Sequence, residues 1–316
     1  MQDRLPLRPT RDAPKRWSYT RLQQRLAPYV FVSPFFILFA VFGLFPLLFS
    51  LFLAFHIWSP LDGLGNWRFV GFENFALALE PSDQFWSTLR NTVWIGLLSG
   101  VPQHLVALPL AYLIHTGLKR WQRGVSTLLF LPYITNAVAI SIVFGVLYSE
   151  RLGLLNYLRG MVGLDPLRWL GDPDLVPTSV AAVIFWRYVG WNVVLYLSGL
   201  QAISEDVYEA ATVDGATGWQ KFRHITLPLL RPMMFYAFTL TIIGNMQIFE
   251  EPFMLVGESG GAGAAGLTSA MHIFNTAFRD LDMGYAAAMS WLLFLAIFVL
   301  SLLNNFLLGR GDGGAR

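Results

Sequence analysis

The 24 residues EAATVDGATGWQKFRHITLPLLRP, from Glu209 to Pro232, form a polar stretch between two strongly apolar parts of the chain. The pattern predicts a short helix from Glu209 to Val213, a turn at Asp214-Gly215, and a second helix that runs from Ala216 into Pro228. Asp-Gly is a strong turn signal because glycine tolerates positive φ and Asp can hydrogen-bond its own backbone. Proline is unfavourable inside a helix, so Pro228 is expected to end the second helix where the next apolar stretch begins.

The composition of the whole chain is that of a membrane protein. Of its 316 residues, 55% are hydrophobic and only 13% are charged, and the mean hydropathy is +0.51. A soluble domain has about 25% charged residues. The net charge of +2 creates no strong field for nucleic acid. The chain has no cysteine, which excludes disulfides, thiolate metal sites and cysteine nucleophiles.

Six apolar stretches are long enough to cross a bilayer, which takes about 20 residues. They lie at about residues 29–55, 86–114, 125–148, 176–200, 229–256 and 284–308. We therefore expect an all-α, polytopic membrane protein with about six transmembrane helices. Its parts would be a basic N-terminal tail (1–28), a transmembrane domain (29–308) and a short C-terminal tail (309–316). The N-terminal tail is not expected to be a secretory signal, because it is polar and the apolar run that follows it is too long for the hydrophobic part of such a signal.

The distribution of Lys and Arg predicts the orientation of these spans. Of the 22 Lys and Arg residues, 15 lie in the two tails and in the loops 115–124 and 201–231, whereas five lie in the loops on the other side. Cytoplasmic loops are enriched in Lys and Arg. Both termini and the loop 201–231 are therefore predicted to be cytoplasmic. On the opposite side, Leu154 to Val162 predicts a short amphipathic surface helix, and Arg90 is expected to snorkel to the interface.

With this topology, the polar stretch resembles the Glu-Ala-Ala loop of binding-protein-dependent ABC importer permeases. The segment LYLSGLQAISEDVYEAA at 195–211 is similar to the sugar-permease branch, of the maltose, glycerol-phosphate and oligosaccharide type. The resemblance implies a type I importer permease in a bacterial or archaeal plasma membrane, with residues 201–232 as a loop that docks on the ATPase. The residues it assigns to docking are Glu209, Ala210, Ala211, Asp214, Gly215, Ala216, Phe222, Ile225, Leu227 and Pro228.

The residue types in this docking loop (201–232) suit a close protein contact. The three alanines of the motif have small side chains, so that the backbone of the loop and the backbone of a partner protein can approach closely. Glu209 is expected in the first turn of its helix, where the helix dipole favours a carboxylate and where it can pair with a Lys or Arg of the partner. Phe222 and Ile225 are three residues apart, on one face, and are expected to anchor the second helix to the membrane domain. A solvated amphipathic loop of a channel or another transporter is the alternative.

Polar and aromatic residues in the spans that flank the docking loop are candidates for a substrate path. Polar groups in lipid are costly unless they are paired or face water. The candidates are Arg187, Tyr188, Trp191 and Asn192 before the loop and Thr241, Asn245, Gln247 and Ile248 after it. Tyr, Trp and Asn suit a neutral sugar, and the resemblance points to the same two spans. Asn and Thr also form hydrogen bonds between membrane helices, and this alternative stays open.

Arg187 has two possible roles on sequence grounds. It could bind an anionic solute such as a glycerol phosphate, or it could pair with Glu250 or Glu251. The alternative to a sugar importer is therefore an ABC importer of the same kind that transports a glycerol phosphate or another polar solute.

A membrane-embedded enzyme is the alternative from a different class. The five histidines form no H-E-x-x-H motif, and no serine lies in a G-x-S-x-G setting, so neither a catalytic residue nor a metal site is predicted. The glycine-rich run GESGGAGAAG at 257–266 lacks G-K-[ST] and is expected to be a flexible outer loop. No Walker A motif occurs in the chain.

The resemblance therefore implies that ATP and Mg are bound by a partner ATPase, with no cofactor in this chain. The partners it implies are four in all: a second, homologous permease subunit, a dimer of ABC ATPase subunits, an extracytoplasmic solute-binding protein and the lipid bilayer. No nucleic acid is expected.

Overall fold

The computed structural model describes residues 19–63 and 65–308. The predicted C-terminal tail and the first 18 residues of the predicted N-terminal tail lie outside these ranges. The chain forms two units, Met1–Phe52 and Leu53–Arg316, and each is considered by itself.

The described part of the first unit is helical. It consists of α1 (Tyr19–Phe39), the π-helical turn η1 (Ala40–Leu44) and the start of α2 (Phe45–Ala54). The stretch Leu26–Ala54 is long and apolar enough to span a membrane, and this confirms the first predicted span. The first helix begins at Tyr19, within the predicted tail (1–28).

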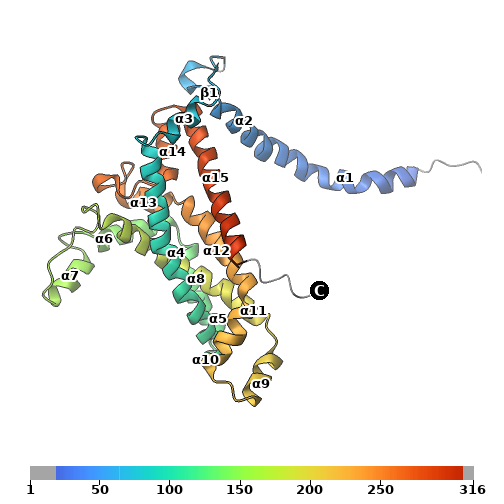
Figure 1. The fold of residues 1–316 in the computed structure, drawn as a ribbon, viewed down its shortest axis with the longest axis vertical. Coiled ribbons are helices and arrows are strands. Elements are labelled where there is room, and N and C mark those ends of the chain that lie inside the picture. The colour runs from blue at the N-terminus through green and yellow to red at the C-terminus, as the bar shows by residue number, and fades with distance from the viewer. Residues whose placement is uncertain (1–18, 64, 309–316) are drawn as a thin grey trace, which may run out of the picture. The chain divides into compact units, whose positions relative to one another are not determined.

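The second unit begins with a small cap of loops, strands and a short helix. Strands β1 (His56–Ile57) and β2 (Arg68–Phe69) pair antiparallel, with the turn η2 (Pro60–Asp62) between them. Helix α3 (Glu73–Leu79) follows, and its buried Asn74 amide donates to the carbonyl oxygens of Ala54 and His56, each at 3.0 Å. The helices α14 (Ser269–Phe278) and α15 (Met283–Leu308) return to this end of the unit (Figure 1).

Three helices build the centre of the unit: α4 (Gln84–Gly117), α8 (Val176–Gln201) and α12 (Arg231–Met246). Asp83 starts α4, since its carboxylate accepts the Phe85 N–H at 2.7 Å. Small residues allow the helices to approach closely: a Cβ at Gly100 would meet the Asn245 side chain at 2.8 Å. The buried core includes Ala107, Ala111, Ile114, Val193, Leu197, Leu200 and Ala237.

Two of the six predicted spans are broken rather than continuous. The third consists of α5 (Gln122–Ile134) and α6 (Ala137–Leu147), bent by 90° at Thr135–Asn136, where the Asn136 side chain accepts the Val138 N–H at 2.8 Å and starts α6. The fifth, predicted at 229–256, divides into α12 and α13 (Glu250–Val256), with a break between Met246 and Glu250, and residues 231–256 are bent by 67° from the docking-loop helices at 218–229. Four described helices are thus long enough to span alone, and up to six if each bent pair is one span.

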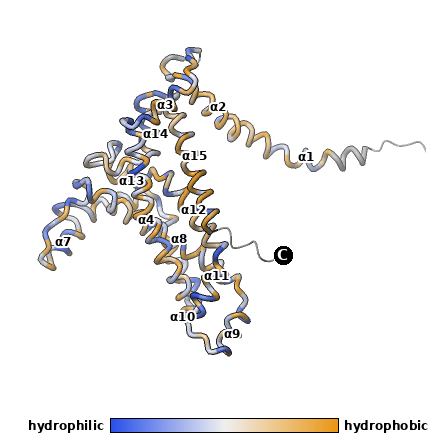
Figure 2. The backbone as a smooth tube through the Cα atoms, viewed as in Figure 1, coloured by the Kyte–Doolittle hydropathy of each residue, from blue (hydrophilic) through white to orange (hydrophobic). Residues whose placement is uncertain are grey.

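Of two segments on the predicted outer side, one has the predicted structure and one does not. Helix α7 (Leu154–Met161) confirms the predicted surface helix. The run at 257–266 is not an open loop: it contains the turn η4 (Ala262–Ala264), the Gly266 N–H bonds the Gly260 carbonyl at 2.8 Å, and the Asn91 amide donates to the Ala264 carbonyl at 3.0 Å. In Figure 2, α15 is hydrophobic over most of its length, while hydrophilic residues gather around α10 (Gly218–Lys221) and α14.

Candidate functional site

The docking loop folds into a compact set of short helices at one end of the second unit (Figure 1). Helix α9 (Glu205–Val213) is followed by α10 (Gly218–Lys221), the π-helical turn η3 (Phe222–Thr226) and α11 (Leu227–Leu229). The predicted turn is confirmed, since Gly215 has φ +79°. This backbone conformation favours glycine.

Three details of the loop differ from the prediction. Helix α9 begins four residues before Glu209, because the Ser204 hydroxyl accepts the Asp206 N–H at 3.3 Å; Glu209 is therefore in the second turn, and the first turn holds Glu205 and Asp206. The second helix begins at Gly218, where Thr217 and Gln220 form a capping box.

The third difference concerns Pro228, which does not end the helix. The chain stays helical to Leu229, because the preceding turn is widened and the Leu227 N–H bonds the Phe222 carbonyl. Proline has no N–H to satisfy, so it is tolerated at the start of α11 directly after this turn.

Contacts within the chain hold the docking loop against α4. Phe222 is buried, with its ring 4.9 Å from that of Tyr112, and the Tyr112 hydroxyl donates to the Gly218 carbonyl at 3.2 Å. The Tyr208 and Thr226 hydroxyls are hydrogen-bonded at 2.9 Å and join α9 to η3. These contacts fix the two helices of the loop to each other and to a membrane helix.

An ion pair holds the start of α9. The Lys119 ammonium lies 2.7 Å from the Glu205 carboxylate. The hydrogen bond raises the pKa of Lys119 and lowers the pKa of Glu205. Glu209 lines a cavity of about 410 Å³ together with Lys119, and the Glu209 carboxylate also helps to raise the pKa of Lys119.

Apolar side chains of the loop are left exposed. Val213 is 88% exposed and Trp219 is 66% exposed, on α9 and α10. Ala210 is exposed as well, whereas Ala211 is buried. An exposed apolar surface next to small residues is suited to contact with another protein.

The predicted path residues separate into two groups. In the first group, polar side chains hydrogen-bond between α4, α8 and α12. The Asn192 amide donates to Gln103 Oε1 at 2.9 Å, the Asn245 amide donates to the Gly96 carbonyl at 3.0 Å, and Thr241 Oγ1 lies 3.0 Å from His104 Nε2. Ile248 is buried among apolar residues, while Gln247 is exposed. Helix–helix bonding thus occupies these Asn and Thr side chains.

His104 is a structural residue that the sequence did not single out. Its Nδ1 is hydrogen-bonded to the Tyr196 hydroxyl at 2.7 Å, so the imidazole joins α8 to α12 through both nitrogens. Only its position in a span marked it in the sequence. No group of three His, Asp or Glu residues that could hold a metal ion is found in the described ranges.

The second group is an aromatic cluster beside an ion pair. Tyr188 and Trp191 of α8 meet Phe130 and Tyr133 of α5; the Trp191 ring stacks on that of Tyr133 with centroids 4.6 Å apart. Arg187 pairs with Glu251 of α13, and Glu250 lies 3.8 Å away. Phe130 and Tyr133 were not among the predicted path residues. Their spacing of three residues, which places both on one face of a helix, was the sequence feature that could have indicated them.

The helices long enough to span a membrane, joined by a helical loop at one end, define a multi-pass membrane protein. A family model described as "Binding-protein-dependent transport system inner membrane component" matches residues 92–310. The chain belongs to this family.

Similar sequences support this family assignment. The chain is 32% identical to the arabinooligosaccharides transport system permease protein AraP of Bacillus subtilis (strain 168), over 94% of each chain. It is 33% identical to the lactose transport system permease protein LacF of Rhizobium radiobacter, over 88% of this chain and 92% of LacF. A chain of a bacterial alginate ABC transporter, solved in complex with a periplasmic protein bound to an alginate pentasaccharide, has a similar fold, with a TM-score of 0.78 at 23% identity over 95% of this chain and 100% of that one.

Proposed function

We propose that this chain is the permease subunit of an ATP-driven importer for a neutral sugar or oligosaccharide. The observation that carries the sugar assignment is the aromatic cluster of Phe130, Tyr133, Tyr188 and Trp191 within the membrane helices. Aromatic faces and nearby polar groups are suited to the C–H faces and hydroxyls of a sugar. The names of AraP and LacF support the same substrate class.

A neutral solute is favoured over an anionic one such as a glycerol phosphate. The Arg187 guanidinium is already paired with the Glu251 carboxylate, and that side chain is 3% exposed. An anionic solute would have to displace the Glu251 carboxylate from the Arg187 guanidinium. The buried carboxylate would then have no partner, which is energetically costly.

In this proposal the docking loop couples the chain to ATP hydrolysis on another subunit. Its exposed Val213 and Trp219 would contact an ABC ATPase, which binds ATP and Mg. A second permease, two ATPase copies and an extracytoplasmic binding protein complete the importer, with the docking loop on the cytoplasmic side. Because α9–α11 are fixed to α4, motion of the ATPase would be passed to the spans, which alternate between inward and outward access.

The test is ATP-driven uptake by the assembled importer in proteoliposomes. Trp191→Ala and Tyr133→Ala should each raise the KM for the sugar about 2- to 10-fold, which corresponds to about 0.4–1.4 kcal/mol of lost contact between a ring face and the sugar. Tyr157→Ala is the matched control, because Tyr157 lies on α7 and is 65% exposed. Unchanged KM in both cluster variants would remove the aromatic cluster from the substrate path.

A separate measurement tests the coupling role. Trp219→Ala should reduce co-purification of the ATPase with the permease, while Trp67→Ala, on the loop between β1 and β2, should not. Full ATPase recovery with Trp219→Ala would contradict the docking assignment without affecting the sugar assignment.

A further inference from the structure

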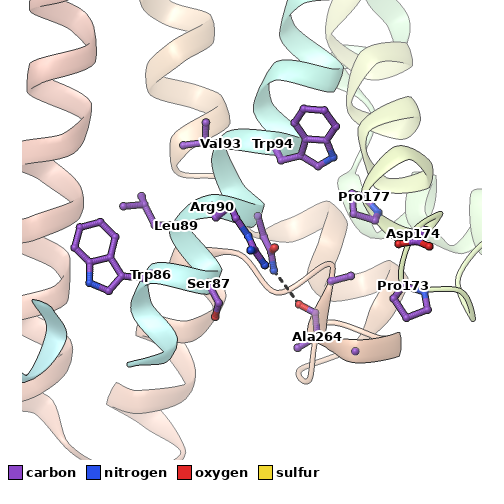
Figure 3. A pocket seen from close by; sticks show the side chains of 13 residues that line it. Trp86, Ser87, Leu89, Arg90, Val93, Trp94, Pro173, Asp174, Pro177 and Ala264 are labelled. Atoms are coloured by element: carbon purple, nitrogen blue, oxygen red, sulfur yellow. Dashed lines mark hydrogen bonds between the residues drawn. The ribbon is translucent and has the colours of Figure 1, made fainter. Parts of the chain in front are cut away.

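A cavity of about 780 Å³ opens beside the first three turns of α4 (Figure 3). The start of α4 lies at the opposite end of the second unit from α9 and α10 (Figure 1). Trp86, Arg90 and Trp94 line it from α4, Asp174 from the segment before α8, and Ala264 from the turn η4. Its volume lies within the range of about 300–1,000 Å³ typical of small-molecule sites. The Asn91 amide fixes one wall by donating to the carbonyls of Ala264 and Leu267, at 3.0 and 3.2 Å.

The cavity holds one cation and one anion, and neither has a partner among residues 19–63 and 65–308. Arg90 is the only charged residue of α4. Within the described part of the chain, neither its guanidinium nor the Asp174 carboxylate takes part in an ion pair or a side-chain hydrogen bond. Both side chains are exposed. An uncompensated charge at the edge of a membrane helix is unfavourable unless it meets water or a complementary ligand.

The position of Arg90 along α4 corresponds to the level of lipid headgroups. The part of α4 without Asp, Glu, Lys or Arg starts directly after Arg90 and continues to the end of the helix at Gly117, which is more than the about 20 residues that cross the hydrocarbon core. Arg90 therefore lies at the end of the stretch that can cross the core. Trp86 and Trp94, one turn to either side of it, are 43% and 53% exposed, and exposed Trp residues are typical of the membrane–water interface.

An apolar track leads from the cavity toward the centre of α4. Val93, Leu97 and Val101 follow one another at intervals of four residues on one helix face. They are 37%, 51% and 48% exposed. Their side chains offer a surface on which a hydrocarbon chain can lie.

We propose that this cavity binds the headgroup of a zwitterionic phospholipid of the phosphoethanolamine type. The phosphate is held by Arg90, the ammonium group faces Asp174, and an acyl chain lies along Val93, Leu97 and Val101. The opposite charges on two walls select a zwitterion over an anion, and the track selects a lipid over a soluble phosphate. A docking segment of an extracytoplasmic protein would use the charges but not a track at hydrocarbon depth.

The experiment is native mass spectrometry of the assembled importer, purified with the full chain and exposed to phosphatidylethanolamine or phosphatidylglycerol of the same acyl chains. The wild type should retain more phosphatidylethanolamine. Arg90→Gln should lower retention of both lipids about tenfold, the size expected for one lost charge-assisted hydrogen bond. Asp174→Asn should remove the preference for phosphatidylethanolamine and leave phosphatidylglycerol retention intact. Arg151→Gln and Asp165→Asn are the matched controls, since both residues lie outside the cavity.

Three outcomes would overturn the proposal. One is equal lipid retention by Arg90→Gln and the wild type, with the melting temperature of each complex measured to show that both are folded. A second is displacement of the lipid by soluble phosphoethanolamine, which would show that the acyl track contributes nothing. The third is loss of coupling to the extracytoplasmic binding protein in Arg90→Gln with unchanged lipid retention, which would make the cavity a protein-docking site.

Discussion

Arg187 of α8 pairs with Glu251 of α13, and the two side chains are only 12% and 3% exposed. The pair joins the span before the docking loop to the short helix that follows the break in the fifth span. Glu250, its neighbour, is exposed and lies 3.8 Å from the same guanidinium. A buried pair of this kind fixes α13 in place, because separating the charges would leave a carboxylate in a medium that solvates it poorly.

Replacing Arg187 alone should therefore destabilise the permease strongly. Arg187→Gln leaves the buried Glu251 carboxylate without its partner, and breaking a buried pair costs about 3–5 kcal/mol. The measurement is the thermal midpoint of the purified complex. Arg187→Gln combined with Glu251→Gln should recover most of the loss, since neither charge then remains. Arg279→Gln, which breaks the exposed pair with Glu258, is the control and should change the midpoint little. A midpoint for Arg187→Gln equal to that of this control would show that the buried pair does not hold α13.

Gly190 should tolerate no side chain. A Cβ at this position of α8 would collide with the Leu129 carbonyl of α5, so the two helices would have to move apart. Gly190→Ala should destabilise the fold by about 1–3 kcal/mol, the usual cost of overpacking. Gly145→Ala on α6 is the matched control because a Cβ there meets nothing within 4 Å. Chemical denaturation of the two variants compares them, and equal midpoints would contradict the close approach of α5 and α8.

The sequence was sufficient for the helical class and for the approximate positions of the spans, because about 20 consecutive apolar residues leave few alternatives in a membrane. It was insufficient for the breaks. The bend at Thr135–Asn136 lies inside a stretch whose average hydropathy is high over its whole length, so hydropathy alone does not record the bend. A polar residue that can cap, such as Asn136, within a span is the local signal for such a break.

The candidate site was predicted in part for a similar reason. The pattern around Gly215 specified a turn because only the local backbone was involved, and the structure has that turn. The start of α9 was misplaced because the Ser204 cap lies upstream of the motif that drew attention. The partners of Asn245 and Asn192 were unpredictable residue by residue, since Gly96 and Gln103 lie about 90 to 150 positions away on another helix.

The turn between α9 and α10 should depend on Gly215 through its backbone alone. A Cβ at Gly215 meets nothing within 4 Å, but its φ of +79° is unfavourable for other residues by about 1–2 kcal/mol. Gly215→Ala should lower ATP-driven uptake and ATPase co-purification, and Gly215→Asn should have a smaller effect because Asn adopts positive φ more readily. Gly218→Ala is the control, because Gly218 also has open space for a Cβ and does not have positive φ. Equal uptake by Gly215→Ala and Gly218→Ala would show that the turn geometry is not required.

The attachment of α9 should depend on pH through Lys119 and Glu205. The hydrogen bond from Lys119 lowers the pKa of Glu205 from its usual value near 4.5, so its contribution is present above that value and is lost as the pH falls through the lowered pKa. The pKa of Lys119 is raised from 10.5, so its contribution is lost only as the pH rises through the raised value.

A spin label at Val207→Cys can report this, since the chain has no other cysteine. Label mobility should stay constant from about pH 5 to about pH 9 and rise in more acidic solution. Glu205→Gln should be mobile throughout, whereas Asp206→Asn, on the same turn without a Lys partner, should follow the wild type. High salt should increase the mobility at pH 7, because an exposed pair is screened. If Glu205→Gln and the wild type have the same mobility at pH 7, the ion pair does not hold the start of α9, and the contacts of Phe222 and Tyr208 alone fix the docking loop.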